Sequence, residues 1–409
     1  MDFDETPEEQ AFRLEVRHFL EEHATLKTGT TADWSRGAMS DNEEVEQLFN
    51  VKAQQWQRTL YDNGWAGITW PKEFGGRGAT PAEAIIFGQE ASAFDVSQGF
   101  FGTALSLVGP ALMRHGSPAQ QQRYLPPLLR GDEKWCQLFS EPGAGSDLAA
   151  LSTRAVRDGD ELVVNGQKVW NSQAQHADFG ILIVRTNPDA PKHRGISFLL
   201  LDMRTPGVDV RPLREATGQA FFNEVFVSDV RVPIDQVVGA IDEGWAVTRT
   251  VLTSETGMIG SGRGAANFDA LKRLAGEVGR RGDPVIRQGL ADVYARERVL
   301  DFLGMRMQTY VMHGRGNPPD PSVLKNFNIA TNEIKADLGL QLQLAGGMLS
   351  REDAAEHGLW QNFVMSQFAS RIGGGTNEVH RNMIAERALG LPREAQLDKD
   401  LPWRDAVKA

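Results

Sequence analysis

The hydrophobic periodicity changes twice along this 409-residue chain. Up to about residue 130, apolar residues recur at helical spacing, and Thr6-Pro7-Glu8-Glu9 has the form of a capping box with proline in the first turn. Short β-rich runs follow, from about residue 134 to residue 227, and long amphipathic stretches resume at Gly244. A chain with this order must fold as helices, then a sheet, then helices, so we predict a mainly α member of the α+β class.

The predicted elements fall into these three parts. The first part is predicted to form helices that begin at Pro7 and that cover Asn42–Asn63, Pro81–Phe94, Ser97–His115 and Pro118–Arg130. The second is predicted to form a small antiparallel barrel or sandwich, with hairpin turns at Asp158-Gly159 and Asn165-Gly166, from the runs Lys134–Phe139, Ser152–Val156, Glu161–Val164, Lys168–Ser172, Gly180–Arg185, Ile196–Leu201 and Phe221–Val227. The third is predicted to form a helical bundle from Ala246–Gly279, Val285–Val311, Ser322–Leu344, Asp353–Arg371 and Asn377–Leu389. We therefore predict an N-terminal helical domain over residues 1–132, a middle antiparallel β-barrel domain over residues 133–240 and a C-terminal four-helix bundle over residues 241–409.

Composition excludes several classes of function. A net charge of −11 argues against nucleic acid and anionic membrane surfaces as partners, and no apolar run approaches the ~20 residues of a membrane span. The only cysteine, Cys136, excludes an internal disulfide and is typical of a reducing compartment. The acidic N-terminus resembles no signal peptide, so we expect a cytoplasmic protein. The eight histidines lack metal-ligand spacing, and Ser146 lacks the surroundings of a hydrolase nucleophile.

The stretch Leu138–Asp147, with the sequence LFSEPGAGSD, is the strongest candidate for a binding loop. Gly143 and Gly145 indicate a tight turn whose backbone a flat ligand can approach closely. Ser140, Ser146 and the N–H groups of the loop are small donors of the kind that hold a phosphate or a ring oxygen. A plain surface turn is the alternative, and a Gly-Ala-Gly sequence alone would favour it.

The neighbours of this loop favour a binding role. It follows an apolar run, Trp135–Phe139, and precedes strands that carry Trp170. This combination resembles the flavin-binding signature of the acyl-CoA dehydrogenase family, whose three-part layout matches almost the whole chain. The resemblance implies FAD as the cofactor and conversion of an acyl-CoA to the trans-2-enoyl-CoA, with electrons passed to an electron-transfer flavoprotein. Such a reaction needs a base for the α proton and the flavin for the β hydride.

The resemblance also implies the positions that bind the cofactor. Trp170-Asn171-Ser172 matches the tripeptide that covers the flavin ring, although without the upstream loop a barrel-core aromatic would be the preferred interpretation of Trp170. Gln343–Gly347 resembles a turn that reaches the flavin of a neighbouring subunit, with a helix C-cap as the alternative. Thr376 opens the last helix, whose N-terminus is expected near the pyrophosphate and adenosine. The implied cofactor-binding residues are Gln137, Leu138, Phe139, Ser140, Gly145, Ser146, Trp170, Asn171, Ser172, Gln343, Gly346, Gly347, Thr376 and Glu378, and the implied substrate contacts are Ser146 and Gly374.

The catalytic base is implied by a comparison of two positions. Many family members carry a glutamate two residues before the threonine that matches Thr376, where this chain has Gly374. A second branch, which includes isovaleryl- and long-chain enzymes, supplies the glutamate from the first bundle helix, and the matching residue is Glu255. Because one position is empty and the other is filled, Glu255 is the implied base, with a solvated helix carboxylate as the alternative. The backbone N–H of Gly374 and a flavin hydroxyl are then expected to bind the forming enolate.

Two departures from the family pattern concern the pocket and the assembly. Thr256 stands where members usually have an arginine after the glutamate. The segment GRRGDPVIRQG holds Arg280, Arg281, Arg287 and Gln288, but the spacing differs from that of the residues that cross to a neighbouring flavin, so none is assigned. The Gln343–Gly347 turn implies a homotetramer, and the unmatched segment makes an α2β2 heterotetramer with a related subunit the alternative. Such a heterotetramer is expected to act on bulky acyl-CoAs, and Gly373–Gly375, which lack side chains, also favour a bulky acyl group. The rival functions are a flavin monooxygenase or nitroalkane-oxidase-like member of the same fold, and a non-catalytic partner subunit.

Overall fold

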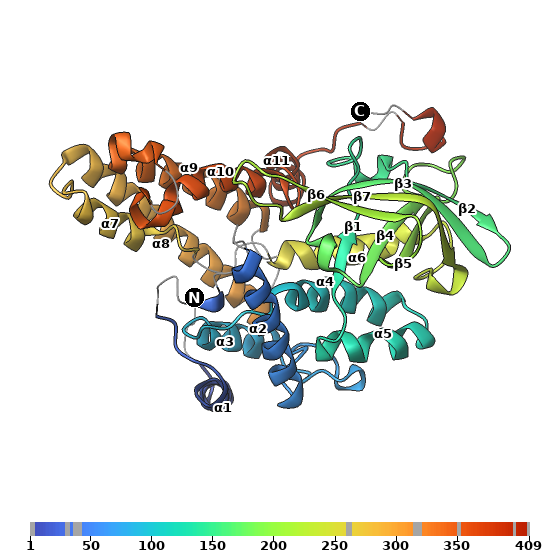
Figure 1. Ribbon diagram of the computed structural model, residues 1–409, viewed down its shortest axis with the longest axis horizontal. Coiled ribbons are helices and arrows are strands. Elements are labelled where there is room, and N and C mark those ends of the chain that lie inside the picture. Colours follow the sequence, from blue (N-terminus) through green and yellow to red (C-terminus); the bar gives the residue numbers. More distant parts are fainter. Residues whose placement is uncertain are drawn as a thin grey trace. The chain divides into compact units, whose positions relative to one another are not determined.

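The structure is a computed structural model, which describes residues 5–28, 33–35, 43–258, 264–313, 321–349, 353–395 and 398–406. The chain divides into two compact units. The larger unit comprises residues 4–255 and 395–409, and the smaller unit comprises residues 1–3 and 256–394. Figure 1 labels the helices and strands of both units.

Helices form the N-terminal part of the larger unit, as predicted. Their bounds are α1 Pro7–His23, α2 Glu43–Asp62, α3 Pro81–Ala91, α4 Gly99–His115 and α5 Pro118–Arg130. The side chains of Thr6, Thr80 and Ser117 cap α1, α3 and α5, and each belongs to a complete capping box with proline in the first turn. The apolar faces of these helices pack into one core, which includes Phe12, Val16 and Leu20 of α1.

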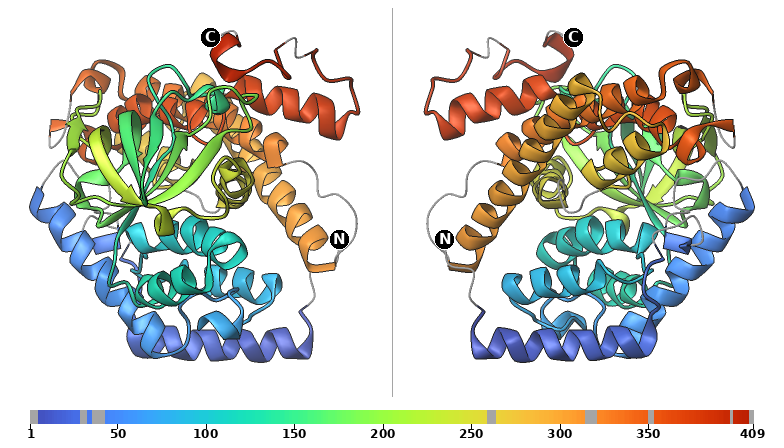
Figure 2. Two further views of the ribbon diagram at one scale, coloured as in Figure 1. Left: turned by 90° about the vertical axis from the view of Figure 1, so that its right-hand side faces the viewer. Right: turned by 90° about the vertical axis from the view of Figure 1, so that its left-hand side faces the viewer.

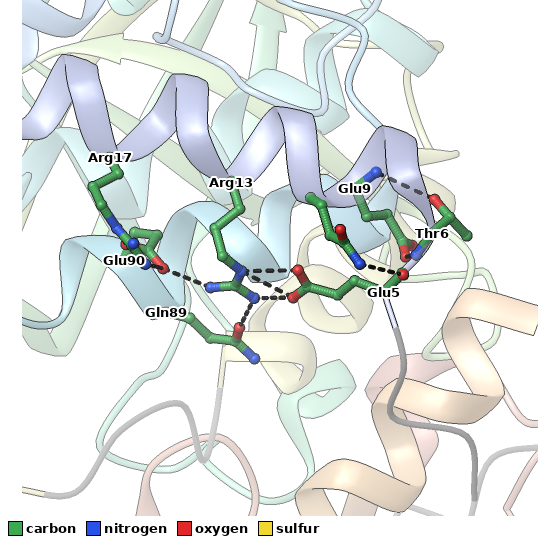
Figure 3. Close-up of polar contacts among 8 residues, drawn as sticks. Glu5, Thr6, Glu9, Arg13, Arg17, Gln89 and Glu90 are labelled. Carbon is green, nitrogen blue, oxygen red and sulfur yellow. Dashed lines mark hydrogen bonds and ion pairs between the residues drawn. The ribbon is translucent and has the colours of Figure 1, made fainter.

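An ion-pair network joins α1 to α3 at the edge of this core (Figure 3). The guanidinium of Arg13 donates hydrogen bonds to both carboxylate oxygens of Glu5 and, at 2.6 Å, to Glu90 on α3. The Nε atom of Arg17 donates to the other oxygen of Glu90 at 2.9 Å. One carboxylate thus binds two arginines one turn apart, which fixes how α1 lies along α3.

A seven-stranded sheet forms the middle of the larger unit, and Figure 2 shows that it is curled. Its strands are β1 Trp135–Leu138, β2 Arg154–Asp158, β3 Glu161–Ser172, β4 Phe179–Arg185, β5 Ile196–Asp202, β6 Val208–Leu213 and β7 Phe222–Pro233. The strand order is β1-β4-β2-β3-β7-β6, with β5 also paired to β4. The pairing is mostly antiparallel, as predicted, but β1 and β2 both run parallel to β4.

Two details of the predicted strands are corrected. Asp158-Gly159 does form a hairpin turn, between β2 and β3, but Asn165-Gly166 lies inside β3 and forms no turn. That second prediction is wrong because both sides of the dipeptide pair with the same partner, β7, across a register shift next to Gly166. Strand β6 was not predicted from the sequence.

The helix α6, Gly244–Met258, follows the sheet. Gly244 lies against the backbone of β5, where a Cβ atom would stand 2.5 Å from the N atom of Phe198, so only glycine is tolerated at this helix start. One helix was predicted over Ala246–Gly279, but the described residues 264–267 are not helical. A new helix, α7 (Phe268–Glu277), begins after Asn267, whose side chain caps it by accepting from the N–H of Ala270 at 3.0 Å.

The smaller unit is a helical bundle. Its helices are α7, α8 Pro284–His313, α9 Pro321–Gln343, α10 Leu359–Ile372 and α11 Asn377–Met383, the last of which continues as a π-helical turn over Ile384–Ala388. The fully buried Trp360 of α10 packs with Leu271 and Leu274 of α7 and with Leu338 of α9 in the core of the bundle. No helix among the described residues is long and apolar enough to cross a membrane.

The C-terminal segment 398–406 returns to the larger unit. The indole N–H of Trp403 donates to the carbonyl of Ala150 at 3.2 Å, and its ring lies 5.0 Å from the guanidinium of Arg185. Lys192 forms ion pairs with both Asp398 of this segment and Asp147 at the end of the candidate loop, at 3.5 and 2.9 Å. The segment is thereby held next to the exit of the candidate loop.

Candidate functional site

The candidate loop leaves the end of β1 through two buried residues, Leu138 and Phe139. Glu141 and Ala144 then exchange two backbone hydrogen bonds, of 3.1 and 3.0 Å, which close a tight turn. Gly143 and Gly145 are exposed, and a Cβ atom at either position would meet nothing within 4 Å. Neither glycine has a positive φ, so their role is to leave the backbone open to a ligand.

A buried ion pair between β3 and the turn holds the turn in place. The Nζ atom of Lys168, on β3, donates to the carboxylate of Glu141 at 2.8 Å, and the side chains are 0% and 4% exposed. The carboxylate also accepts from the N–H and hydroxyl of Ser152 and from the N–H of Thr153, at 2.7–2.9 Å. Burial alone would raise the pKa of Glu141, but Lys168 and these donors hold it at about 2. Burial lowers the pKa of Lys168 to about 8, although Glu141 opposes that shift.

Trp170 projects outward next to this pair. Its backbone has a φ of 61°, a conformation that residues other than glycine rarely adopt, and its side chain is 59% exposed. The register explains the conformation: between Lys168 and Asn171, β3 advances three residues while β7 advances two, from Val225 to Asn223. Strand β3 therefore carries a bulge, and such bulges turn a side chain away from its regular face.

The residues after Trp170 are fixed by side-chain amides. Asn171 is buried and donates through Nδ2 to the carbonyl of Gln137 on β1 at 2.9 Å. Asn223, directly opposite on β7, donates to the carbonyl of Asn171 at 3.0 Å. Ser172 is exposed, like Trp170. The structure thus brings together the predicted residues 137–146 and 170–172 in one region of the larger unit.

Glu255, the predicted base, lies on α6 eleven residues after Gly244. Its side chain, like those of Thr256 to Met258, lies outside what the structure describes.

In the smaller unit, the Gly373–Gly375 turn is held by two buried side chains that were not predicted. The Nζ atom of Lys325, on α9, donates to the carbonyls of Gly373 and Gly375 at 2.6 and 2.5 Å. The Nε2 atom of His380 donates to the carbonyl of Gly374 at 2.9 Å. In a trans peptide the C=O and the following N–H point in opposite directions. The N–H groups of residues 374–376 therefore point away from Lys325 and His380.

The same turn has the backbone conformation of glycine. Gly374 and Gly375 have φ values of 64° and 94°. A glutamate at position 374 would be strained in this conformation, by about 1–2 kcal/mol. Thr376 then caps α11 by accepting from the N–H of Val379 at 3.3 Å, and Glu378 lies in the first turn of that helix.

The Gln343–Gly347 turn lies at the other end of α9. Gln343 is buried and accepts through Oε1 from the amide of Gln361 at 3.0 Å, whereas Leu344, in the turn, is 68% exposed. Lys325 and Gln343 are 18 residues apart on α9, which corresponds to about 27 Å at the rise of an α-helix. Within one bundle, the Gly373–Gly375 turn and the Gln343–Gly347 turn are thus far apart.

Arg280 and Arg281 of the unassigned basic segment contact other residues of the smaller unit. Arg280 donates to the carboxylate of Asp283 and to the carbonyl of Gln341, both at 2.6 Å. Arg281 lies against Gly276, where a Cβ atom would stand 2.7 Å from the guanidinium. Arg287 and Gln288 lie in the first turns of α8. Within the part of the chain that the structure describes, no three His, Cys, Asp or Glu side chains are placed to hold a metal ion.

Family models match all three parts of the chain. The model for the acyl-CoA dehydrogenase N-terminal domain matches residues 6–132, that for the middle domain residues 136–230, and that for the C-terminal domain residues 242–389. Acyl-CoA dehydrogenase IpdE1 of Mycobacterium tuberculosis is 35% identical over 392 residues, which are 95% of this chain and 99% of that protein. The chain belongs to the acyl-CoA dehydrogenase family. As an acyl-CoA dehydrogenase it is an oxidoreductase.

Other acyl-CoA dehydrogenases similar to this chain include a longer protein and members of two-protein complexes. FadE34 of M. tuberculosis is 37% identical over 85% of this chain, which spans only 48% of that longer protein. Among solved structures, the ChsE4-ChsE5 complex from M. tuberculosis has a TM-score of 0.79 and 31% identity, with 96% of this chain and 100% of that chain covered. The Tcur3481-Tcur3483 steroid acyl-CoA dehydrogenase has a TM-score of 0.77 and 30% identity, with the same coverage.

Proposed function

We propose that this acyl-CoA dehydrogenase uses FAD to oxidise an acyl-CoA thioester between its α and β carbons to the trans-2-enoyl-CoA. The observation that carries the proposal is the presentation of Trp170, an exposed aromatic side chain in a strained conformation, beside Ser172 and an open glycine loop. Strain of this kind persists where the surrounding structure enforces it, and it gathers at ligand-binding sites. A flat aromatic cofactor is the ligand that such a surface suits.

The residues of the larger unit fit the flavin end of FAD. Trp170 offers a ring face, Ser172 a hydroxyl, and the Gly143–Ser146 turn an accessible backbone without side chains in the way. When bound, FAD would supply the acceptor for the β hydride. In the smaller unit, Thr376 and Glu378 would approach its pyrophosphate and adenosine side, and the Gln343–Gly347 turn would approach the cofactor of another subunit.

Two groups of the chain would move the proton and hold the negative charge. Glu255 would remove the α proton, a task for which Gly374 has no side chain. The N–H of Gly374, which points away from the side chains that hold its turn, would bind the thioester oxygen as negative charge develops on it. Ser146 would contact the substrate beside the flavin. This division of roles assigns the base and the enolate donor to different segments.

The substrate is proposed to be an acyl-CoA with a bulky or ring-bearing acyl group. Gly373–Gly375 would leave the wall of an acyl pocket without side chains, and one structural relative is a steroid acyl-CoA dehydrogenase. A related subunit in an α2β2 assembly is proposed beside the homotetramer, because another relative of the whole chain is a two-protein complex. An electron-transfer flavoprotein is the proposed electron acceptor.

The test is to purify the chain, alone and co-expressed with related subunits, and to release its cofactor with acid. We expect a yellow protein that releases FAD. Its flavin should be reduced anaerobically by steroid or other ring-bearing acyl-CoAs at least about tenfold faster than by short straight-chain ones, a ratio within the reach of pocket contacts. Release of FMN, or a colourless protein that takes up no FAD with any candidate partner, would contradict the proposal. Reduction by none of the acyl-CoAs would contradict the assigned reaction.

A further inference from the structure

Three hydrogen bonds, here called ties, connect the bulge of β3 to the candidate loop. The Nζ atom of Lys168 donates to the carbonyl of Phe139 at 3.0 Å as well as to Glu141. The N–H of Val169 donates to the carbonyl of Ser140 at 2.9 Å. Lys168 and Val169, the residues just before Trp170, are thereby bound to three consecutive loop residues, Phe139, Ser140 and Glu141.

These ties determine where Trp170 can point. Lys168, Val169 and Asn171 are all buried, and each is bonded toward β1 or the loop. Trp170 stands between these fixed residues at the bulge, with its backbone in the left-handed conformation and its ring exposed. That conformation is unfavourable by about 1–2 kcal/mol for a residue with a side chain, so it must be enforced by its neighbours.

Lys168 is the unusual residue among those that form these hydrogen bonds, because its side chain carries a positive charge and is wholly buried. A wholly buried ammonium group requires a charged partner, and Glu141 supplies it from the turn itself. A buried ion pair is weak evidence for stability, since well-packed apolar side chains of similar size often replace one without loss. Apolar side chains could not replace the hydrogen bond from Lys168 to the carbonyl of Phe139, nor the four hydrogen bonds that Glu141 accepts from Lys168, Ser152 and Thr153. These five hydrogen bonds fix the shape of the turn.

We propose that Lys168 and Glu141 are a positioning pair for the cofactor, which acts by holding Trp170 outward beside the loop. This inference rests on the proposed function, because it takes the ligand of Trp170 to be FAD. Both side chains are buried, so the pair would act without contact to cofactor or substrate, by holding the backbone that carries the ring and the loop. Removal of the pair should loosen the bulge and let Trp170 leave its strained conformation, while the sheet around it stays folded.

The test is a double-mutant cycle on FAD affinity in the full chain. One arm is the charge-free pair Glu141→Gln with Lys168→Met, which avoids leaving a single buried charge. The other arm is Trp170→Ala, and the third variant combines all three substitutions. Each variant is stripped of flavin, titrated with FAD and compared with wild type, with circular dichroism to verify the fold. The matched control is Glu297→Gln with Lys335→Met, another buried pair, in the smaller unit, with its charged atoms 3.7 Å apart.

The expected result is coupling between the pair and Trp170. The charge-free pair should weaken FAD binding by about tenfold, and in the Trp170→Ala background the same substitutions should add no more than about twofold, because contacting or coupled sites are not additive. The control pair should change FAD affinity by less than about twofold. FAD affinity unchanged in the charge-free pair, or losses that multiply fully in the combined variant, would overturn the inference.

A second readout needs no cofactor. The fluorescence of Trp170, taken as the difference between a protein and its Trp170→Phe counterpart, reports how far acrylamide reaches the ring. We expect a changed quenching constant for Trp170 in the charge-free pair and an unchanged one in the control pair. If wild type bound no FAD, the proposed function would fail, and an unchanged quenching constant would then separately overturn the positioning role.

Discussion

Glu255 is the residue on which the proposed chemistry depends most directly. Substitution Glu255→Gln keeps the size of the side chain but removes its ability to accept the α proton. General base catalysis is worth about 10²–10⁴-fold, so we expect anaerobic flavin reduction by a good acyl-CoA substrate to slow by at least about 100-fold. The variant should still bind FAD, and substrate should still perturb the flavin spectrum. Glu73→Gln, an exposed carboxylate of the larger unit, is the matched control and should retain the wild-type rate. Flavin reduction at close to the wild-type rate in Glu255→Gln would place the base elsewhere.

Buried charged residues near the candidate site were harder to predict than the residues of the family motif. The family motif pointed to residues 137–146 and 170–172, which do lie together. It gave no role to Glu141, within the first range, or to Lys168. One signal was available: Lys168 has the same parity along β3 as the buried Leu162 and Val164, which places it on the inner face. Lys325 offered no such signal, because its contacts with Gly373 and Gly375 span about 50 residues of sequence.

At the scale of elements, the packing of α9 on α10 depends on a helical glycine. A Cβ atom at Gly339 would stand 2.3 Å from the ring of the fully buried Trp360. We expect Gly339→Ala to destabilise the bundle by about 1–3 kcal/mol through overpacking, against a gain of up to about 1 kcal/mol in helix propensity. The measurement is the midpoint of thermal unfolding, compared with wild type.

The matched control for this prediction is Gly304→Ala on α8. A Cβ atom there meets nothing within 4 Å, so only the propensity term remains and the midpoint should stay or rise. If Gly339→Ala raised the midpoint as much as Gly304→Ala, the close packing against Trp360 would be contradicted.

Element boundaries followed from the sequence where local chemistry sets them and failed where distant contacts do. The capping box predicted at Thr6 is present, because such a motif involves only neighbouring residues. Thr80 and Ser117, which were not predicted as caps from the sequence, begin α3 and α5 with the same motif. Asn165-Gly166 resembled a turn, but long-range pairing with β7 overrides that local preference. The break between α6 and α7 was signalled by four glycines, at positions 257, 260, 262 and 264, which helical periodicity alone did not reveal.

At the scale of the whole molecule, the two ends of α9 argue for assembly. The Gly373–Gly375 turn lies near the start of α9 and the Gln343–Gly347 turn at its end, about 27 Å away by the helical rise. Thr376 and Glu378, which follow the first turn, are proposed to meet one FAD, and the second turn is proposed to meet the FAD of another subunit, so one chain should serve two cofactors. We expect a homotetramer or an α2β2 heterotetramer in light scattering of the chain alone and after co-expression with related subunits. An active, flavin-loaded monomer would contradict this prediction.

The return of segment 398–406 to the larger unit has a consequence for how the protein is made. The chain leaves this unit at Glu255 and re-enters it at Ala395, so the bundle is a long insertion in the larger unit. During synthesis, Asp398 and Trp403 leave the ribosome only after the entire bundle. Until then, Arg185 cannot contact Trp403 and Lys192 cannot pair with Asp398. The exit of the candidate loop is therefore among the last places to be completed during synthesis. In the finished protein, a single backbone cut between the units would leave the bundle still attached at its other end.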